Sequence, residues 1–68
     1  MGEAEDRAQR IWLGGLQDEA ITKARRCKEL AHEIYDESID AANYFERAAS
    51  WLEEAEQEIS NKSLEYAP

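Results

Sequence analysis

Residues 20–59 have the sequence AITKARRCKELAHEIYDESIDAANYFERAASWLEEAEQEI. Small and apolar residues recur along this stretch at alternating steps of four and three, which is a heptad pattern. The members of this stripe are Ala20, Ala24, Cys27, Ala31, Ile34, Ser38, Ala41, Phe45, Ala48, Leu52, Ala55 and Ile59. A sustained heptad pattern is typical of a helix that packs along a coiled-coil seam. The fold class is therefore predicted to be all-α.

The remainder of the chain is divided by a pair of glycines. Gly14-Gly15 interrupts residues that otherwise favour helix, and beyond it there is no further glycine and no proline before Pro68. We expect a short helix over residues 3–13, a hinge at the glycine pair, and a long helix or helical hairpin over residues 16–60. Residues 61–68 are predicted to form a tail. The whole chain is expected to be a single small helical domain.

The alanine-rich seam fits an antiparallel partner better than a parallel one. Pairing residues about a centre between Ile39 and Asp40 sets small residues against small ones and large residues against large ones, as close packing requires. The same pairing brings the basic residues 23–28 level with the acidic residues 53–58. The predicted seam consists of Ala24, Cys27, Ala31, Ile34, Phe45, Ala48, Leu52 and Ala55.

Two architectures satisfy this pairing. A hairpin that turns within residues 36–40 makes the contacts inside one chain, whereas a continuous helix over residues 17–59 makes them between two chains. Possible caps such as Ser38 favour the turn, and the absence of glycine and proline favours the continuous helix. We expect the long helix in an antiparallel homodimer, because the core of so short a chain stabilises a fold weakly by itself. The hairpin is the alternative.

The composition limits the classes of partner. The 68 residues include 16 acidic and 8 basic side chains, for a net charge of −8. Nucleic acid and anionic membranes bind basic surfaces, so neither is an expected partner. No apolar run has the length of a membrane span, and residues 1–6 lack the features of a secretory signal. We therefore expect a cytoplasmic protein.

No catalytic, cofactor or metal site is predicted, and we expect no enzymatic activity. Glu29 and His32 have the Glu-x-x-His spacing of di-iron bundles, but they fall on the side of the helix opposite the seam. Cys27 lies on the seam, where a cysteine is usually a small, inert apolar residue. With one cysteine in the chain, an internal disulfide is excluded.

The aromatic residues exceed what a single helical seam can bury. On the second half of the long helix they widen the apolar face, and a second cluster lies beside the glycine pair. We expect the short helix to fold back and place Trp12 over Trp51 or Tyr44, because large exposed apolar patches are uncommon. The same residues are the candidate surface for another protein: Ile11, Trp12, Leu13, Tyr44 and Trp51.

The function we predict is a non-enzymatic protein–protein interaction module, a small dimeric helical adaptor or inhibitor that binds and regulates another protein. By analogy alone, it is similar in kind to small acidic helical proteins of phages and mobile elements. The alternative is an inhibitor whose acidic side chains imitate nucleic acid and occupy a basic protein groove. A third hypothesis is an RNA-binding helical hairpin that uses Arg25 and Arg26. The acidic residues of the alternative are Asp36, Glu37, Asp40, Glu46, Glu53, Glu54, Glu56 and Glu58.

Overall fold

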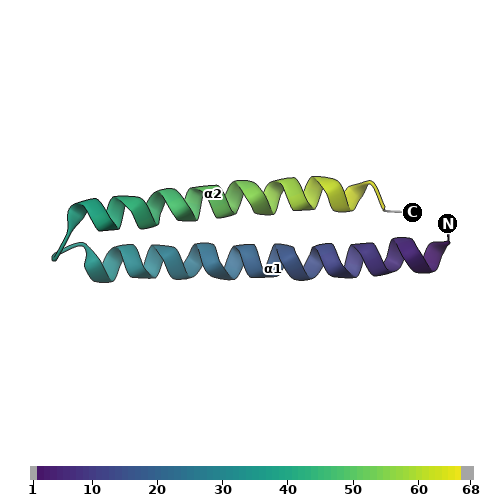
Figure 1. Ribbon diagram of the computed structural model, residues 1–68, viewed down its shortest axis with the longest axis horizontal. Coiled ribbons are helices and arrows are strands. Elements are labelled where there is room, and N and C mark those ends of the chain that lie inside the picture. Colours follow the sequence, from purple (N-terminus) through teal and green to yellow (C-terminus); the bar gives the residue numbers. More distant parts are fainter. Residues whose placement is uncertain (1, 67–68) are drawn as a thin grey trace.

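The computed structural model describes residues 2–66 and contains two helices packed side by side. Helix α1 spans Glu3–Ile34 and helix α2 spans Ile39–Leu64. The two run antiparallel and form a thin rod of 53 × 14 × 12 Å, with both termini at one end (Figure 1). No strand occurs among the described residues. The predicted all-α fold is confirmed.

The chain reverses direction in a short turn between the helices. The N–H groups of Glu37 and Ser38 donate to the Ile34 carbonyl at 2.9 and 2.8 Å and close the end of α1. Ser38 then adopts an extended backbone, and its Oγ accepts a hydrogen bond from the Ala41 N–H at 3.1 Å. This side chain satisfies one of the N–H groups that the first turn of a helix leaves unpaired. The expected continuous helix is therefore wrong, and the hairpin alternative describes the chain.

Helix α1 continues without a break across Gly14-Gly15. The predicted short helix over residues 3–13 is thus the first part of one 32-residue helix, and the glycine pair is not a bend in this structure. A glycine inside a helix costs about 1 kcal/mol relative to alanine, but packing against α2 along the rod offsets this cost. Leu13, directly before the pair, is one of the buried residues.

The register of the two helices differs from the predicted one by about one heptad. The helix ends at Ile34 and Ile39 set which residues lie about level, and the hydrogen bond from Gln17 Nε2 to Glu56 Oε1 at 2.6 Å agrees with this register. One heptad toward the turn from this pair come Ala24 and Ala49, and two heptads away come Ala31 and Ala42; all four alanines are buried. The prediction had set Ala24 level with Ala55, which is exposed. The difference arises because α2 already begins at Ile39, within the predicted turn.

The core between the helices consists almost entirely of alanine. The buried residues are Leu13, Ala20, Ala24, Ala31, Ala42 and Ala49, and none of the described large side chains is fully buried. Alanine lets the helix backbones approach closely, but each alanine removes little apolar area from water. A hairpin with this core leaves most of its large apolar side chains at the surface.

At the C-terminal end, α2 extends further than predicted. It continues to Leu64, so the first part of the predicted tail is helical, and Tyr66 is half-buried; residues 67 and 68 lie outside the described part. Neither helix, over the residues that the structure describes, has the length and apolar character needed to cross a membrane.

Candidate interaction surface

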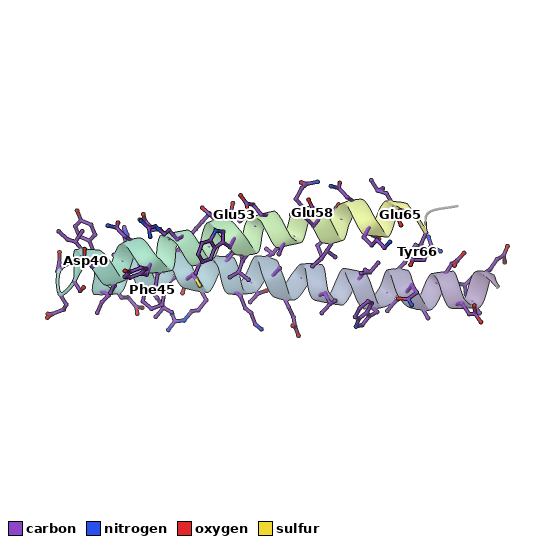
Figure 2. The ribbon with its side chains drawn as sticks, turned by 45° about the horizontal axis from the view of Figure 1, so that its top comes forward. Asp40, Phe45, Glu53, Glu58, Glu65 and Tyr66 are labelled. Carbon is purple, nitrogen blue, oxygen red and sulfur yellow. The ribbon has the colours of Figure 1, made fainter. Side chains whose placement is uncertain are left out.

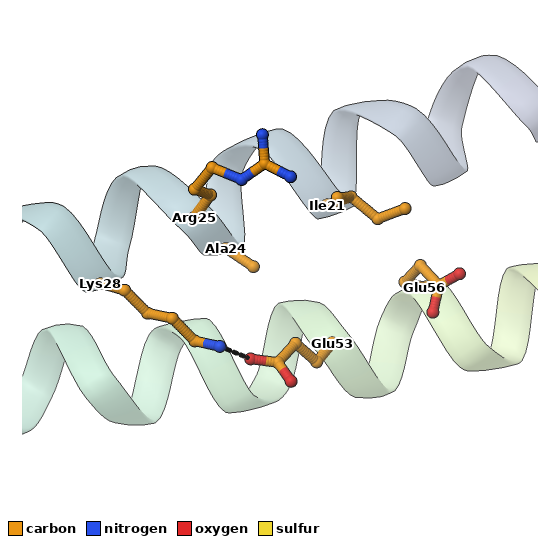
Figure 3. A pocket seen from close by; sticks show the side chains of 6 residues that line it. All are labelled: Ile21, Ala24, Arg25, Lys28, Glu53 and Glu56. Atoms are coloured by element: carbon orange, nitrogen blue, oxygen red, sulfur yellow. Dashed lines mark ion pairs between the residues drawn. The ribbon is translucent and has the colours of Figure 1, made fainter.

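The hairpin has two broad sides, one on each side of the plane that contains both helix axes. One of them is marked by an ion pair between Lys28 Nζ and Glu53 Oε1, which lie 2.8 Å apart (Figure 3). A shallow pocket beside this pair is lined by Ile21, Ala24, Arg25, Lys28, Glu53 and Glu56. We call this the polar side.

The opposite side follows from the helical repeat of α2. Ala42 and Ala49 are buried against α1. Since successive residues of a helix are rotated by about 100°, the preceding residues Ala41 and Ala48 are turned to one side of this contact. Glu53, four residues after Ala49, is turned to the other side, where it meets Lys28. Ala41 and Ala48 therefore lie on the side away from the ion pair.

The same geometry applied to both helices defines a mostly apolar surface, which we call the open face. Its α1 residues are Trp12, Leu16, Lys23, Cys27, Leu30 and Ile34, and its α2 residues are Ala41, Tyr44, Ala48, Trp51, Ala55 and Ile59. Tyr44 and Trp51 form its outer edge on α2, and Glu19 and Arg26 border it on α1. Within this set of described residues, Lys23 carries the one charged side chain.

The large side chains of the open face are incompletely covered. Trp12 is 59% exposed, and Tyr44 and Trp51 are each 67% exposed. Leu16, Cys27, Leu30, Ile34 and Ile59 are half-buried. The Arg47 guanidinium carbon lies 5.7 Å from the centre of the Tyr44 ring, a cation–π distance. The open face therefore carries exposed aromatic side chains, whereas the polar side carries the Lys28–Glu53 ion pair together with the exposed Ile21.

The structure separates the residues of the predicted partner-binding set. Leu13 is 7% exposed and belongs to the core. Trp12 lies on the open face, whereas Ile11, which is also exposed, is turned toward the back of α1. Trp12 lies near the level of the C-terminal end of α2, far along the rod from Tyr44, so the expected packing of Trp12 over Tyr44 or Trp51 does not occur. The fold-back required a hinge that α1 does not have.

The predicted seam residues also divide between two environments. Ala24 and Ala31 are buried; Cys27, Ile34, Phe45, Ala48 and Leu52 are half-buried; and Ala55 is exposed. The seam positions that the sequence reasoning missed are Ala42 and Ala49 on α2. The signal for them was present in the doublets Ala41-Ala42 and Ala48-Ala49, which offer an alanine to either of two neighbouring stripes.

The remaining candidate chemistry is placed at the surface. Glu29 and His32 are exposed, and no group of three or more His, Cys, Asp or Glu residues within residues 2–66 could hold a metal ion. Cys27 is a free, half-buried thiol. These residues are not gathered into a cleft.

The basic stretch of α1 lies among carboxylates. Arg26 Nη1 is 3.2 Å from Glu29 and 3.8 Å from Glu33, and Lys23 Nζ is 4.0 Å from Glu19. These ion pairs are exposed, so each contributes at most about 1 kcal/mol to stability. Arg26, one of the two arginines of the predicted RNA-binding surface, is therefore paired with carboxylates of its own helix.

The surplus negative charge projects from the outer side of α2. Glu58 and Glu65 point away from α1 (Figure 2). Lys62 Nζ lies 2.8 Å from Glu65, and the hydrogen bond and charge of Glu65 raise the pKa of Lys62 above its ordinary value. Of these two carboxylates, Glu65 is therefore paired with a cation, and both lie on the C-terminal side of Trp51.

Comparison with known proteins gives no identity for this hairpin. No family model matches the chain, and no curated protein and no solved structure is significantly similar to it.

Proposed function

We propose that this chain is a non-enzymatic protein–protein interaction module of the cytoplasm, a small dimeric helical adaptor or inhibitor that binds and regulates another protein. The observation that carries the proposal is the exposure of Trp12, Tyr44 and Trp51 on the open face. Tryptophan and tyrosine are enriched among the residues that dominate binding energy at protein interfaces. An apolar surface bordered by charged residues is typical of an interaction site on a small soluble protein.

The rod shape supports the same proposal. Each helix presents side chains at fixed spacing along an uninterrupted axis, so the aromatic residues are held in place by backbone hydrogen bonds. Recognition of an amphipathic helical surface needs anchors at helical spacing, and Tyr44, Ala48 and Trp51 have that spacing. A partner meets a preformed surface and pays little ordering entropy.

The test is capture of a binding protein with wild-type chain as bait, followed by titration of the purified partner. Trp51→Ala is expected to lower the affinity at least about tenfold, as loss of an aromatic anchor does. Arg25→Ala on the polar side is the matched control and should bind like the wild type. Circular dichroism verifies that both variants remain helical. Equal affinity of all three proteins would contradict the proposal.

The alternative function is imitation of nucleic acid by the acidic outer side of α2. What favours it is the net charge of −8 together with the outward position of Glu58 and Glu65. The two functions differ in their salt dependence, because salt screens exposed charges and leaves apolar contacts nearly unchanged. An affinity for the captured partner that falls steeply between 50 and 500 mM NaCl would favour imitation. The paired basic stretch makes RNA binding the weakest of the three hypotheses.

A further inference from the structure

We infer that the open face binds a second copy of this chain, and that two hairpins stack face to face as a four-helix bundle with their turns at opposite ends. The inference rests on the proposed function in one respect, since it names a second copy as the occupant of the open face; another protein that binds Trp12, Tyr44 or Trp51 then competes with the dimer. It replaces the predicted dimer of continuous helices with a dimer of hairpins.

The single hairpin exposes more surface than a compact monomer of its mass. The accessible surface is 5441 Å², whereas a compact monomer of this mass exposes about 4,400 Å². The excess of about 1,000 Å² is close to the roughly 800 Å² per partner that a standard protein interface buries. The radius of gyration points the same way, at 15.7 Å against about 11 Å for a globular chain of this length.

The apolar positions of α2 are more numerous than contact with α1 alone requires. A helix that contacts one neighbour needs a narrow stripe, whereas a helix inside a bundle has apolar residues at about three of every seven positions. Helix α2 has this wider pattern. Ala42 and Ala49 are buried against α1, the open-face residues form a second stripe, and the half-buried Phe45 and Leu52 lie between these two stripes. The members of that second stripe are Ala41, Tyr44, Ala48, Trp51 and Ala55.

The open-face residues of α2 fit an antiparallel copy of the same helix. About a two-fold axis between Ala49 and Ser50, Tyr44 lies level with Ala55 of the other copy, and Ala48 lies level with Trp51 of the other copy. These two layers each combine one small and one large side chain, which is the combination that interdigitates, and Ala41 comes level with Glu58 of the other copy. A parallel arrangement would set Trp51 against its own equivalent.

The same two-fold axis also pairs apolar residues of α1 with apolar residues of the second α1. In the observed register the level of Ala49 and Ser50 corresponds to Lys23 of α1, one residue from Ala24. Two copies related about that level set Leu16 against Leu30 and Trp12 against Ile34. The same axis therefore gives two apolar layers along α1, while Lys23 faces its own equivalent and Cys27 comes level with Glu19 of the other copy.

This arrangement places one like-charge contact and one opposite-charge contact at the face and its border. The two copies of Lys23 meet near the axis, and Glu19 lies 4.0 Å from Lys23 within each hairpin. Glu19 of one copy comes level with Arg26 of the other, so opposite charges face each other at the edge. The polar side, with the Lys28–Glu53 ion pair, remains in solvent.

The experiment begins with sedimentation equilibrium of the full chain between about 1 and 100 μM. The expected mass is twice the 7.8 kDa of the chain, with a melting temperature that rises with protein concentration. Ala48→Glu on the open face is expected to halve the mass at a given concentration. Ser50→Glu introduces the same carboxylate two residues after Ala48, turned away from the open face, and should leave the dimer intact.

Cysteine cross-linking tests the axis itself, and does not require that a monomeric variant stay folded. In a Cys27→Ser background, Lys23→Cys is expected to form a disulfide-linked dimer on mild oxidation, because the two copies of residue 23 meet at the axis. Arg25→Cys in the same background is the control on the polar side and should remain monomeric under denaturing electrophoresis.

The outcomes separate this inference from the proposed function. A wild-type monomer at 100 μM, or equal cross-linking of the two cysteine variants, would overturn the dimer of hairpins. If such a monomer still binds a captured protein through Trp51, the proposed function stands without it. A dimer that cross-links at residue 23 supports the inference whether or not another protein is captured.

Discussion

Ser38 determines where the second helix begins. Its extended backbone ends the turn, and its Oγ accepts the Ala41 N–H at 3.1 Å. We predict that Ser38→Ala lowers the free energy of unfolding by about 1 kcal/mol, because a first-turn N–H loses its partner. Urea denaturation followed by circular dichroism measures the change. Ser50→Ala, in the exposed middle of α2, is the control and should be neutral or slightly stabilising; an equal loss in both variants would mean that the cap contributes nothing.

The burial of Ala49 depends on the register of the two helices. It is 1% exposed, and a larger side chain there has to push the helices apart. We predict that Ala49→Leu costs about 1–3 kcal/mol of stability, as overpacking of a filled core does. Ala8→Leu, at an exposed site on α1, should cost little by the same urea measurement. If Ala49→Leu proved as harmless as Ala8→Leu, the observed register would be wrong.

At the scale of the helix, the glycine pair in α1 is a cost without a visible use in the hairpin. Gly14 and Gly15 have helical backbones, and a Cβ built on either meets no atom within 4 Å. Both lie away from the open face. We predict that Gly14→Ala and Gly15→Ala each stabilise the chain by up to about 1 kcal/mol, measured as a higher melting temperature. Lower helicity or a lower melting temperature in these variants would instead show that the pair bends in solution.

The elements show which parts of the fold a sequence can predict. The heptad stripe predicted the helices, because a 3.6-residue apolar period is typical of helix, and the matching of side-chain sizes and charges about one centre predicted their antiparallel packing. The register was missed because Ala41-Ala42 and Ala48-Ala49 place alanine at two adjacent heptad positions, and only the length of the turn selects between them. The hinge was missed because packing against α2 overrides the local preference of Gly14-Gly15. Sequence reasoning named Trp12, Tyr44 and Trp51 as surface candidates, but it had no means to separate Leu13 from its neighbours.

At the scale of the whole molecule, an alanine core and an apolar face are two aspects of one arrangement. The small residues that let α1 and α2 approach closely leave the larger ones no room between the helices. Three of those larger residues, Trp12, Tyr44 and Trp51, lie on the open face, whereas Ile11 and Ile21 are exposed elsewhere on α1. A second hairpin is the simplest object that covers the open face.

The net charge acts on this assembly as a whole. Each chain carries −8, so two copies repel each other over distances comparable to the Debye length, which shortens from about 30 Å at 0.01 M to about 8 Å at 0.15 M ionic strength. The local ion pairs are exposed and weak, so screening should remove more repulsion than attraction. We predict that the dimer dissociation constant falls and the melting temperature rises when NaCl is raised from 10 to 150 mM. Sedimentation and melting at fixed protein concentration measure the two effects. Glu58→Gln, which removes one outward negative charge from each chain, should make the dissociation constant and the melting temperature less sensitive to NaCl. Salt that weakened the dimer would instead mean that ion pairs such as Glu19–Arg26 dominate the interface.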